Sequence, residues 1–256
     1  MPALSACVIT FNEESKIAAC LGSLVGVADE IVVVDSESTD DTVAIAARFT
    51  DRIITQPFLG YVAQKNFTVD CASHDWILSL DADEQLSDEL RSEILEEKHT
   101  LGAHAGYDMP RRTFYVDEWM DHCWYPDRKI RLFDRRRGRW GGTDPHDSWR
   151  VTEGSVKSLR GDILHRSFDS VSEHLQTIDR FSEIAARELF RQGRRVSVLS
   201  PVVHGAAAFV RLYLVRRGFL DGFGGLVVSL LSATATFTRY AKLRYLQRAE
   251  ERGSDS

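Results

Sequence analysis

The chain lacks several features that would place it in a specialised class of protein. Its 256 residues include only four cysteines, Cys7, Cys20, Cys71 and Cys123, and no two of them form a C-x-x-C pair. This spacing is typical of reduced, mostly buried thiols in a cytosolic protein, and it argues against a disulfide framework or a zinc site. The amino-terminal residues MPALSACVITFNEE contain no basic region followed by a long apolar one, so we expect no secretory signal.

Positive charge is not in excess either. The net charge of −6 at pH 7 argues against a protein that binds nucleic acid as a whole. No internal repeat, low-complexity tract or Gly/Ser linker interrupts the chain. A composition of 43% hydrophobic and 27% charged residues is that of an ordinary globular protein, and the length suits one large α/β domain with an appendage or two small domains.

Apolar runs and helical patterns alternate along the first third of the chain. Strands are predicted at residues 4–11, 30–35, 51–55 and 75–80, and helices at residues 13–25, 38–49 and 61–72. Ser38 or Thr39 is the expected N-cap of the second helix. This rhythm predicts a parallel, right-handed α/β sheet.

Acidic residues follow two of these strands. Asp35 ends the run EIVVVD, and Asp81 and Asp83 follow WILSL. Parallel sheets bind ligands beyond the carboxyl ends of their strands, and in an extended segment side chains two residues apart point the same way. Ser87 is a better N-cap for the next helix, so capping does not explain Asp81 and Asp83. Two close carboxylates favour Mg²⁺ or Mn²⁺ shared with a phosphate, although a D-x-D pair met alone also fits a solvated turn.

Four segments carry a resemblance to a known family. VITFNEE, VVVDSESTDDT, GYVAQKN and WILSLDADE, in this order and spacing, resemble the nucleotide-sugar half of family 2 glycosyltransferases. The later WYPDRKIRLFD, PHD (145–147) and GDILHRSF are similar to the branch that adds β-linked hexoses to lipopolysaccharide core. The resemblance covers nearly the whole chain and implies the GT-A fold, which is Rossmann-like with a mostly parallel central sheet. Many members read VDDGSTDGT where this chain reads VDSESTDDT, so Ser36 replaces the second acid and Glu37 the glycine.

The resemblance implies a nucleotide-sugar site in the first half of the chain. Thr10, Glu13 and Asp35 would line the nucleobase and ribose pocket, with Asp35 accepting a hydrogen bond from uracil. Lys65 would lie near the diphosphate, although a solvated lysine on a helix face is an equal alternative. Asp81 would lie near the ribose and a metal-bound water.

The same resemblance implies a divalent cofactor, Mg²⁺ or Mn²⁺. Asp83 would bind the metal directly, and the metal would neutralise the charge that develops on the departing nucleoside diphosphate. His165 ends the short apolar run GDILH, where a lone histidine is usually structural. In several GT-A enzymes a histidine in this place completes the metal site, so His165 is the candidate second ligand.

Inverting transfer needs one base to take the proton of the acceptor hydroxyl. Asp147, in the segment GGTDPHDSW, is the candidate, with Asp144 and Asp127 as alternatives and a structural Asx-turn as the non-catalytic explanation. Arg128 and Arg131 fit either a phosphorylated acceptor or pairing with the nearby acids. Aromatic residues of this stretch fit either a small core or stacking on sugar rings: Trp119, Trp124, Tyr125, Trp140 and Trp149.

The C-terminal third is a basic, apolar extension that is predicted to be helical. Its run FLDGFGGLVVSLLSATATF approaches the length of a membrane span, but Asp221 and three glycines argue against a simple crossing. A basic, apolar helix pair is typical of a protein lying in the interface of an anionic membrane, and a helical dimer interface is the alternative. We therefore expect peripheral association with the cytoplasmic face of the inner membrane, with a homo-oligomer as a compatible possibility.

Together with these patterns, the resemblance implies an inverting, metal-dependent glycosyltransferase that moves a hexose, with glucose from UDP-glucose as the expected donor, onto a membrane-borne saccharide such as lipopolysaccharide core. The expected organisation is a nucleotide-sugar half (1–105), an acceptor half (106–170) and the helical extension (171–256). One rival, a sugar-phosphate nucleotidyltransferase, would open with a Gly-rich basic loop, which TFNEES is not. Another, a non-catalytic membrane scaffold that keeps the fold, would tolerate loss of the acids named above.

Overall fold

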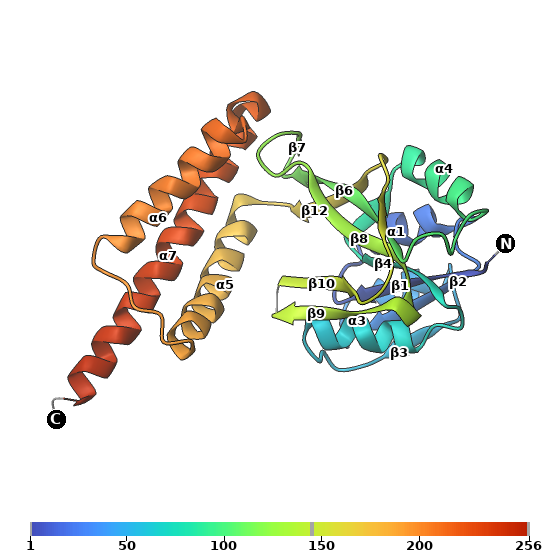
Figure 1. Ribbon diagram of the computed structural model, residues 1–256, viewed down its shortest axis with the longest axis horizontal. Helices are drawn as coiled ribbons and strands as arrows, with labels where there is room; N and C mark the ends of the chain where they lie inside the picture. Colours follow the sequence, from blue (N-terminus) through green and yellow to red (C-terminus); the bar gives the residue numbers. More distant parts are fainter. Residues whose placement is uncertain (1, 144–145, 255–256) are drawn as a thin grey trace. The chain divides into compact units, whose positions relative to one another are not determined.

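A computed structural model describes residues 2–143 and 146–254 of the chain (Figure 1). By contacts between residues, the chain divides into two compact units. The sheet unit comprises Met1–Arg112 and Pro126–Arg166, and the helical unit comprises Thr113–Tyr125 and Ser167–Ser256. The segment Thr113–Tyr125, inside the predicted acceptor range 106–170, thus belongs to the helical unit.

The sheet unit begins with four parallel strands in the order β3-β2-β1-β4. Their bounds are β1 (Leu4–Thr10), β2 (Glu30–Asp35), β3 (Ile53–Thr55) and β4 (Trp76–Asp81). The apolar runs of β1, β2 and β4 are largely buried, as expected for a parallel sheet covered by helices, whereas the edge strand β3 is only partly buried. Thr10 pairs in register with Asp35, and Ile9 with Asp81. The carboxyl ends of three strands therefore meet at one edge.

Four helices connect these strands and extend the sheet unit: α1 (Ile17–Leu24), α2 (Thr42–Ala46), α3 (Tyr61–Asp70) and α4 (Asp88–Glu97). The predicted cap of α4 is confirmed, because the Ser87 side chain accepts a hydrogen bond from the N–H of Leu90 at 3.1 Å. The predicted cap of α2 is wrong. Residues 38–41 form a loop before that helix, and the Ser38 hydroxyl instead accepts from the N–H of Asn12 at 2.8 Å.

Beyond β4 the sheet becomes mixed, and its order continues β4-β8-β6-β12-β5. The added strands are β5 (Glu84–Leu86), β6 (Gly106–Tyr115), β8 (Asp127–Asp134) and β12 (Ile163–Phe168), with β11 (Val156–Ser158) and β7 (Glu118–Met120) paired to β6. β8 runs antiparallel to both β4 and β6. The predicted α/β class, with a mostly parallel central sheet, is confirmed.

A separate two-stranded hairpin completes the sheet unit. After the short 3₁₀ turn η1 (Arg135–Arg137), β9 (Gly138–Thr143) pairs antiparallel with β10 (His146–Val151). Trp140 and Trp149 face each other across this hairpin and are buried, and the Trp149 ring stacks on Phe133 with centroids 3.6 Å apart. These two tryptophans are core residues, so they are not available to stack on sugar rings.

The helical unit is built around one long helix. α5 (Val171–Arg191) and α6 (Ser200–Phe209) both pack against α7 (Gly222–Ser254). A π-helical segment, η2 (Val210–Val215), and a 3₁₀ turn, η3 (Gly218–Asp221), connect α6 to α7. The rings of His204 and Tyr240 stack 4.1 Å apart between α6 and α7. The predicted helical character of the C-terminal third is confirmed.

Asp221 and the glycines around it have structural roles in the turn before α7. The Asp221 carboxylate is buried and accepts hydrogen bonds from the backbone N–H groups of His122 and Cys123 at 3.1 and 2.8 Å. A Cβ atom on Gly225 would lie 1.9 Å from the carbonyl oxygen of Gly218, so only glycine fits there. These residues close a tight turn.

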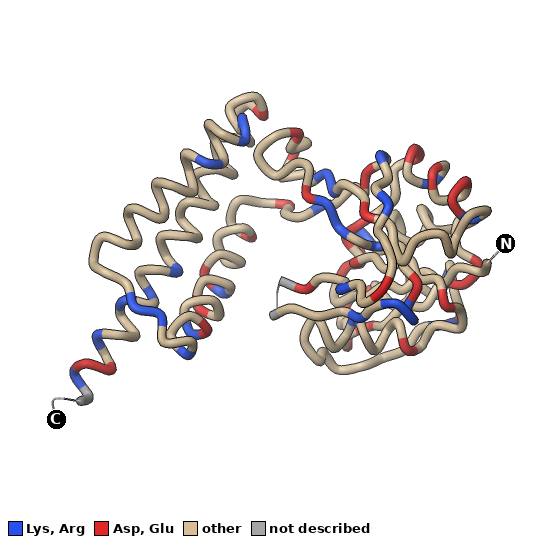
Figure 2. The backbone as a smooth tube through the Cα atoms, in the orientation of Figure 1, with Lys and Arg blue, Asp and Glu red and all other residues tan. Residues whose placement is uncertain are grey.

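The helical unit also exposes much apolar surface. Among the described residues, the stretch Gly218–Arg252 is the one helical segment long and apolar enough to span a membrane, judged by length and composition. From Arg194 to Ala249 the sequence contains one acidic residue, Asp221; Figure 2 shows this stretch carrying basic residues and almost no acidic ones. Strongly exposed apolar side chains lie here: Val198, Leu199, Val202, Val203, Leu214, Val215, Phe219, Leu220 and Phe223.

Candidate active site

The carboxyl edge of the parallel strands gathers polar groups that the fold leaves unsatisfied. Asp35 ends β2 with only 2% of its surface exposed, and its Oδ2 accepts the N–H of Ser38 at 2.9 Å. Its Oδ1 and the Thr10 hydroxyl, at the end of β1, are buried and have no hydrogen-bond partner among the described residues. Buried polar atoms without partners are rare, because leaving them so costs free energy. A bound polar ligand would satisfy both.

The loop after Asp35 contains the two departures from the pattern of the family that the chain resembles. Glu37, which replaces a glycine, has a φ of 65°, in the left-handed region that favours glycine. Ser36, which replaces an acid, is buried and accepts a hydrogen bond from Gln64 Nε2 at 3.1 Å. The N–H of Glu13 donates to the Thr42 hydroxyl at 2.7 Å, which fixes the loop after β1 against the start of α2.

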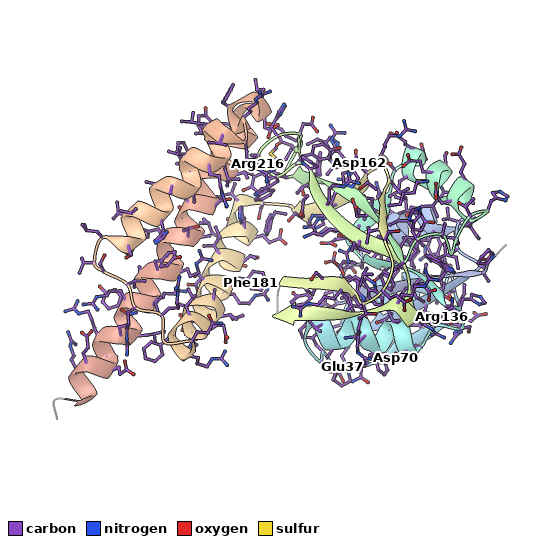
Figure 3. The ribbon with its side chains drawn as sticks, viewed as in Figure 1. Glu37, Asp70, Arg136, Asp162, Phe181 and Arg216 are labelled. Carbon is purple, nitrogen blue, oxygen red and sulfur yellow. The ribbon has the colours of Figure 1, made fainter. Side chains whose placement is uncertain are left out.

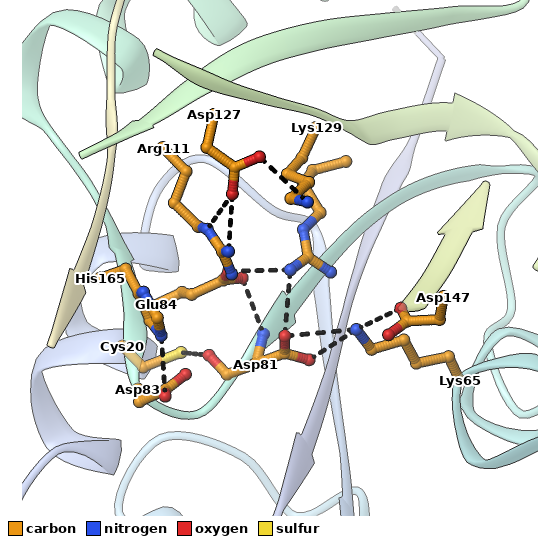
Figure 4. A network of polar contacts seen from close by, with 11 residues as sticks. Cys20, Lys65, Asp81, Asp83, Glu84, Arg111, Asp127, Lys129, Asp147 and His165 are labelled. Atoms are coloured by element: carbon orange, nitrogen blue, oxygen red, sulfur yellow. Dashed lines mark hydrogen bonds and ion pairs between the residues drawn. The ribbon is translucent and has the colours of Figure 1, made fainter. Parts of the chain in front are cut away.

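Lys65 lies at the centre of the site, not on a solvated helix face. It projects from α3 with its side chain 3% exposed, and its ammonium nitrogen lies 3.0 Å from Asp81 Oδ1 and 2.8 Å from Asp147 Oδ2 (Figure 4). The same nitrogen lies 4.8 Å from the centre of the Trp140 ring. Lys65, Asp81 and Asp147, which are far apart in sequence, are therefore brought into direct contact.

The β9–β10 hairpin delivers Asp147 to this position. Asn66, the neighbour of Lys65, donates from Nδ2 to the carbonyl of Trp140 at 3.1 Å and accepts the Trp140 N–H at 3.2 Å. These two bonds join α3 to the edge strand β9. Asp147, on β10, is paired in register with Gly142 of β9. The hairpin therefore places the Asp147 carboxylate against Lys65.

Arg131, on β8, was not predicted as a site residue. Its guanidinium is 3% exposed and donates from Nη2 to Asp81 Oδ2 at 3.0 Å and to Glu84 Oε1 at 2.8 Å. Glu84, itself 1% exposed, also accepts from Arg111 at 3.2 Å. Of the two uses foreseen for Arg131, pairing with nearby acids is the one observed. The sequence feature that could have identified Arg131 as a site residue is its position on a strand of alternating polarity that lies beside β4.

Asp127, an alternative base, lies at the far end of the same network. It accepts two hydrogen bonds from Arg111, at 2.7 and 3.2 Å, and lies 3.1 Å from Lys129. Acids and bases alternate through the site in the order Asp127, Arg111, Glu84, Arg131, Asp81, Lys65, Asp147. Asp144, the other alternative, lies outside the described residues.

Asp83 points away from this chain of charges. Residues 82 and 83 form a turn between β4 and β5, so the expectation that Asp81 and Asp83 share one extended segment is wrong. Asp83 Oδ2 instead lies 3.1 Å from Nε2 of His165 on β12, and the N–H of Arg166 donates to the Asp83 carbonyl at 3.0 Å. The turn therefore sends the two carboxylates to different partners.

The Asp83–His165 pair is suited to a divalent cation. A carboxylate and an imidazole are ligands that Mn²⁺ accepts. A cavity of about 50 Å³ is lined by Asp83 together with the basic residues Lys16 and Arg166, and His165 is not part of its lining. Within residues 2–143 and 146–254, no cluster of three or more His, Cys, Asp or Glu side chains could hold a metal. A metal at Asp83 and His165 would need its other ligands from water and a bound phosphate.

The electrostatics keep the site's carboxylates ionised. Burial alone would raise the pKa of Asp81, but the charges of Lys65 and Arg131 outweigh it and hold that pKa well below its usual range. For Asp83, burial likewise raises the pKa, and the charge and hydrogen bond of His165 lower it further than burial raises it. Both carboxylates therefore carry negative charge at neutral pH.

Comparison with known proteins identifies the family. The model of glycosyl transferase family 2 matches residues 5–152. An uncharacterised glycosyltransferase of Rickettsia typhi is 34% identical over 257 residues, covering 96% of this chain and 88% of that protein. The lipopolysaccharide core biosynthesis glycosyltransferase LpsC of Rhizobium meliloti is 29% identical over 256 residues, covering 93% of each.

Solved structures are also similar. Glucosyl-3-phosphoglycerate synthase from Mycobacterium tuberculosis, in complex with Mn²⁺ and UDP-glucose, is 17% identical and covers 77% of this chain and 81% of that one, with a TM-score of 0.46. TarS of S. aureus, in complex with UDP-GlcNAc, is 14% identical and covers 98% and 92%, with a TM-score of 0.44.

A mixed α/β sheet with a polar carboxyl edge, matched by this family model, defines a glycosyltransferase of the GT-A class. The chain belongs to glycosyl transferase family 2. The predictions of family, fold class and enzymatic activity are thereby confirmed, and a sugar-phosphate nucleotidyltransferase is not supported. The roles of the individual site residues remain predictions.

Proposed function

We propose that this enzyme transfers glucose from UDP-glucose, with inversion, to a membrane-borne saccharide such as lipopolysaccharide core. The observation that carries the donor part is the pair of unsatisfied buried atoms, Thr10 Oγ1 and Asp35 Oδ1, at the carboxyl edge of the parallel strands. A uracil N–H could donate to Asp35, and the diphosphate would lie toward the cationic groups. The similarity to LpsC supports an acceptor of the lipopolysaccharide core type.

Asp147 is proposed as the base. Its carboxylate is 12% exposed, so it can reach a substrate while being held by the hairpin. In the reaction, the acceptor hydroxyl gives its proton to Asp147 while its oxygen forms a bond to the anomeric carbon. The bond from that carbon to the diphosphate oxygen breaks, and UDP leaves with the electron pair. Attack from the side opposite the leaving group inverts the configuration.

Asp83 and His165 are proposed to hold Mg²⁺ or Mn²⁺. When bound, the metal neutralises charge on the departing diphosphate. Lys65 and Arg131 are cations of the protein itself in the same region, and Arg131 Nη1 and Nε are buried without a hydrogen-bond partner among the described residues. These donors are available to a ligand oxygen without breaking a bond to the protein.

The helical unit is proposed to rest on the cytoplasmic face of the inner membrane. Exposed apolar side chains at the η2–η3 turn, among them Val215, Phe219 and Phe223, lie beside the exposed Arg211 and Arg216. Apolar groups with flanking arginines suit the interface of an anionic bilayer. A homodimer that covers the same apolar surface is the competing arrangement.

The direct test of the proposed activity is a donor screen. The purified enzyme is incubated with a panel of UDP-, GDP-, ADP- and dTDP-sugars and Mn²⁺ or Mg²⁺, and release of the nucleoside diphosphate is measured. We expect release from UDP-glucose that depends on the metal. Release from a different nucleotide sugar would move the donor assignment, and release equal in EDTA would contradict the metal.

A further inference from the structure

The position of Lys65 raises a question about the proposed base. The Lys65 ammonium has three N–H donors. Two of them are accounted for by carboxylates that arrive from different elements, Asp81 at the end of β4 and Asp147 on the β10 strand. The Lys65 side chain that makes both contacts is almost fully buried. In the ligand-free protein, Asp147 is therefore held by a cation at 2.8 Å.

An ion pair of this kind opposes the function proposed for Asp147. One of the two oxygens of the Asp147 carboxylate, Oδ2, accepts a hydrogen bond from Lys65, so the charge of the group that would take the acceptor's proton is shared with the ammonium. Its negative charge is already stabilised, and charge-assisted hydrogen bonds are about twice as strong as neutral ones. As long as the pair persists, Asp147 is a poor base and a poor partner for an incoming hydroxyl.

A diphosphate offers the ammonium a stronger partner than a carboxylate does. It carries more negative charge and more acceptor oxygens, and a lysine is a mobile point charge on a flexible stem. Asp81 would keep its second cation, Arg131, at 3.0 Å if Lys65 moved. The network thus allows Lys65 to change partners without leaving Asp81 unpaired.

We propose that Lys65 is a positioning residue that makes the base conditional on the donor: the donor's diphosphate draws the ammonium from Asp147 and so frees that carboxylate to accept the acceptor's proton. This inference rests on the proposed function and deepens it. It implies that the donor binds before the acceptor is deprotonated. It also implies that Asp147 and a diphosphate compete for Lys65, and this competition can be measured without knowing the acceptor.

The experiment is calorimetric titration with UDP, and with uridine as the matched ligand that lacks the diphosphate, at one fixed Mn²⁺ concentration. If Lys65 must leave Asp147 to reach the diphosphate, Asp147→Asn should tighten UDP binding by about 5- to 150-fold, the usual range for coupling between two sites. Uridine affinity should not change. Asp70→Asn, on the same helix but 67% exposed and outside the network, is the matched control and should change UDP affinity by less than about twofold (Figure 3).

The second arm tests whether the effect passes through Lys65. In a Lys65→Met background, Asp147→Asn should alter UDP affinity by less than about twofold, because the competition no longer exists. A simple loss of repulsion between Asp147 and the diphosphate would tighten binding equally in both backgrounds. Where Lys65→Met does not fold, Lys65→Gln takes its place, since an amide still donates to Asp81.

The outcomes separate this inference from the function on which it rests. Unchanged or weaker UDP binding by Asp147→Asn, or equal tightening in both backgrounds, overturns the role of Lys65 while the wild-type protein still binds UDP. If the wild-type protein binds no nucleoside diphosphate, the proposed donor site is wrong and the inference fails with it.

Discussion

The two units of this enzyme treat charge in opposite ways. The sheet unit buries Lys65, Glu84 and Arg131 and pairs each of them with an opposite charge. The helical unit contains one acid between Arg194 and Ala249, exposes its arginines and leaves large apolar side chains in contact with solvent. We propose that the difference reflects two ligands of different chemistry: a charged, polar donor for the first unit and an apolar, anionic surface for the second.

The cost of each arrangement also differs. Removing one partner of a buried ion pair costs about 3–5 kcal/mol, because the other charge stays buried without compensation. Removing one exposed apolar side chain or arginine changes the stability of the fold little. Variants at these buried charges should therefore affect both folding and activity, and variants on the exposed face of the helical unit should affect membrane binding alone.

The largest effect is expected at the proposed base. Asp147→Asn keeps the size of the side chain but cannot accept a proton, so turnover should fall by about 10²–10⁴-fold while UDP binding is not weakened. Steady-state transfer and UDP titration measure the two quantities separately. If Asp127→Asn has this effect and Asp147→Asn does not, the base is Asp127.

Removing basic residues from the helical unit should weaken its proposed binding to a membrane. Each basic residue near an anionic surface contributes about 1 kcal/mol, so replacing both Arg211 and Arg216 by Gln should weaken binding to phosphatidylglycerol vesicles by about 30-fold. UDP binding should not change. Sedimentation with vesicles measures the binding, which should weaken with salt but persist through the apolar contacts.

Arg187→Gln with Arg191→Gln is the matched control for this prediction. These arginines on α5 are paired with Glu183 and Glu188, so the same change in charge should have little effect on vesicle binding. A full-length protein that ignores vesicles at low salt, and elutes as a dimer without detergent, would show that the apolar face is an interface between two copies.

A pH dependence of stability should distinguish the helical unit from the sheet unit. His174 is buried among Tyr115, Trp124 and Phe168, and burial lowers its pKa from 6.5 to about 4. Between these pH values the unfolded chain binds a proton that the folded chain does not, so stability should fall as the pH drops from about 6.5 to about 4 and level off below.

Urea unfolding at several pH values, in the wild type and in His174→Gln, measures this effect. The variant should lose the part of the pH dependence that lies in this window. His99→Gln, at an exposed histidine of the sheet unit, is the control and should follow the wild type. If His174→Gln keeps the full pH dependence, the histidine is not held neutral by the fold.

The smallest effect is expected at Glu37. A non-glycine residue in the left-handed region costs about 1–2 kcal/mol, and glycine loses about 0.5–1 kcal/mol more backbone entropy on folding. Glu37→Gly should therefore stabilise the protein by a net amount of about 0.5–1 kcal/mol, seen as a higher midpoint in urea. Glu37→Gln keeps the strained backbone, removes the charge and should leave the midpoint unchanged; a shift equal to that of Glu37→Gly would attribute the effect to charge.

The parallel strands and the acids at their ends could be read from the sequence because both depend on local pattern. Continuous apolar runs such as EIVVV are required by burial on two faces, and register then places Thr10, Asp35 and Asp81 at one edge. The N-cap Ser87 followed from the same local logic. Each of these features is determined within a few residues.

What the sequence could not give depends on long-range packing. The contact between Lys65 and Asp147 spans 82 positions and requires Asn66 to join α3 to the hairpin. Arg131 looked like one of several arginines until its strand was placed beside β4. The turn at residue 83 broke the expected alternation because β5 pairs with β12, which directs Asp83 toward His165. Local propensity contains none of this information.

The central claim is that the carboxyl edge of the sheet binds UDP together with a divalent metal held by Asp83 and His165. Calorimetric titration of UDP with Mn²⁺, with EDTA, and with Asp83→Ala in Mn²⁺ tests it most directly. We predict UDP binding that requires Mn²⁺ and is lost to the same extent in EDTA and in the Asp83→Ala variant. Equal UDP affinity in all three titrations would contradict the claim.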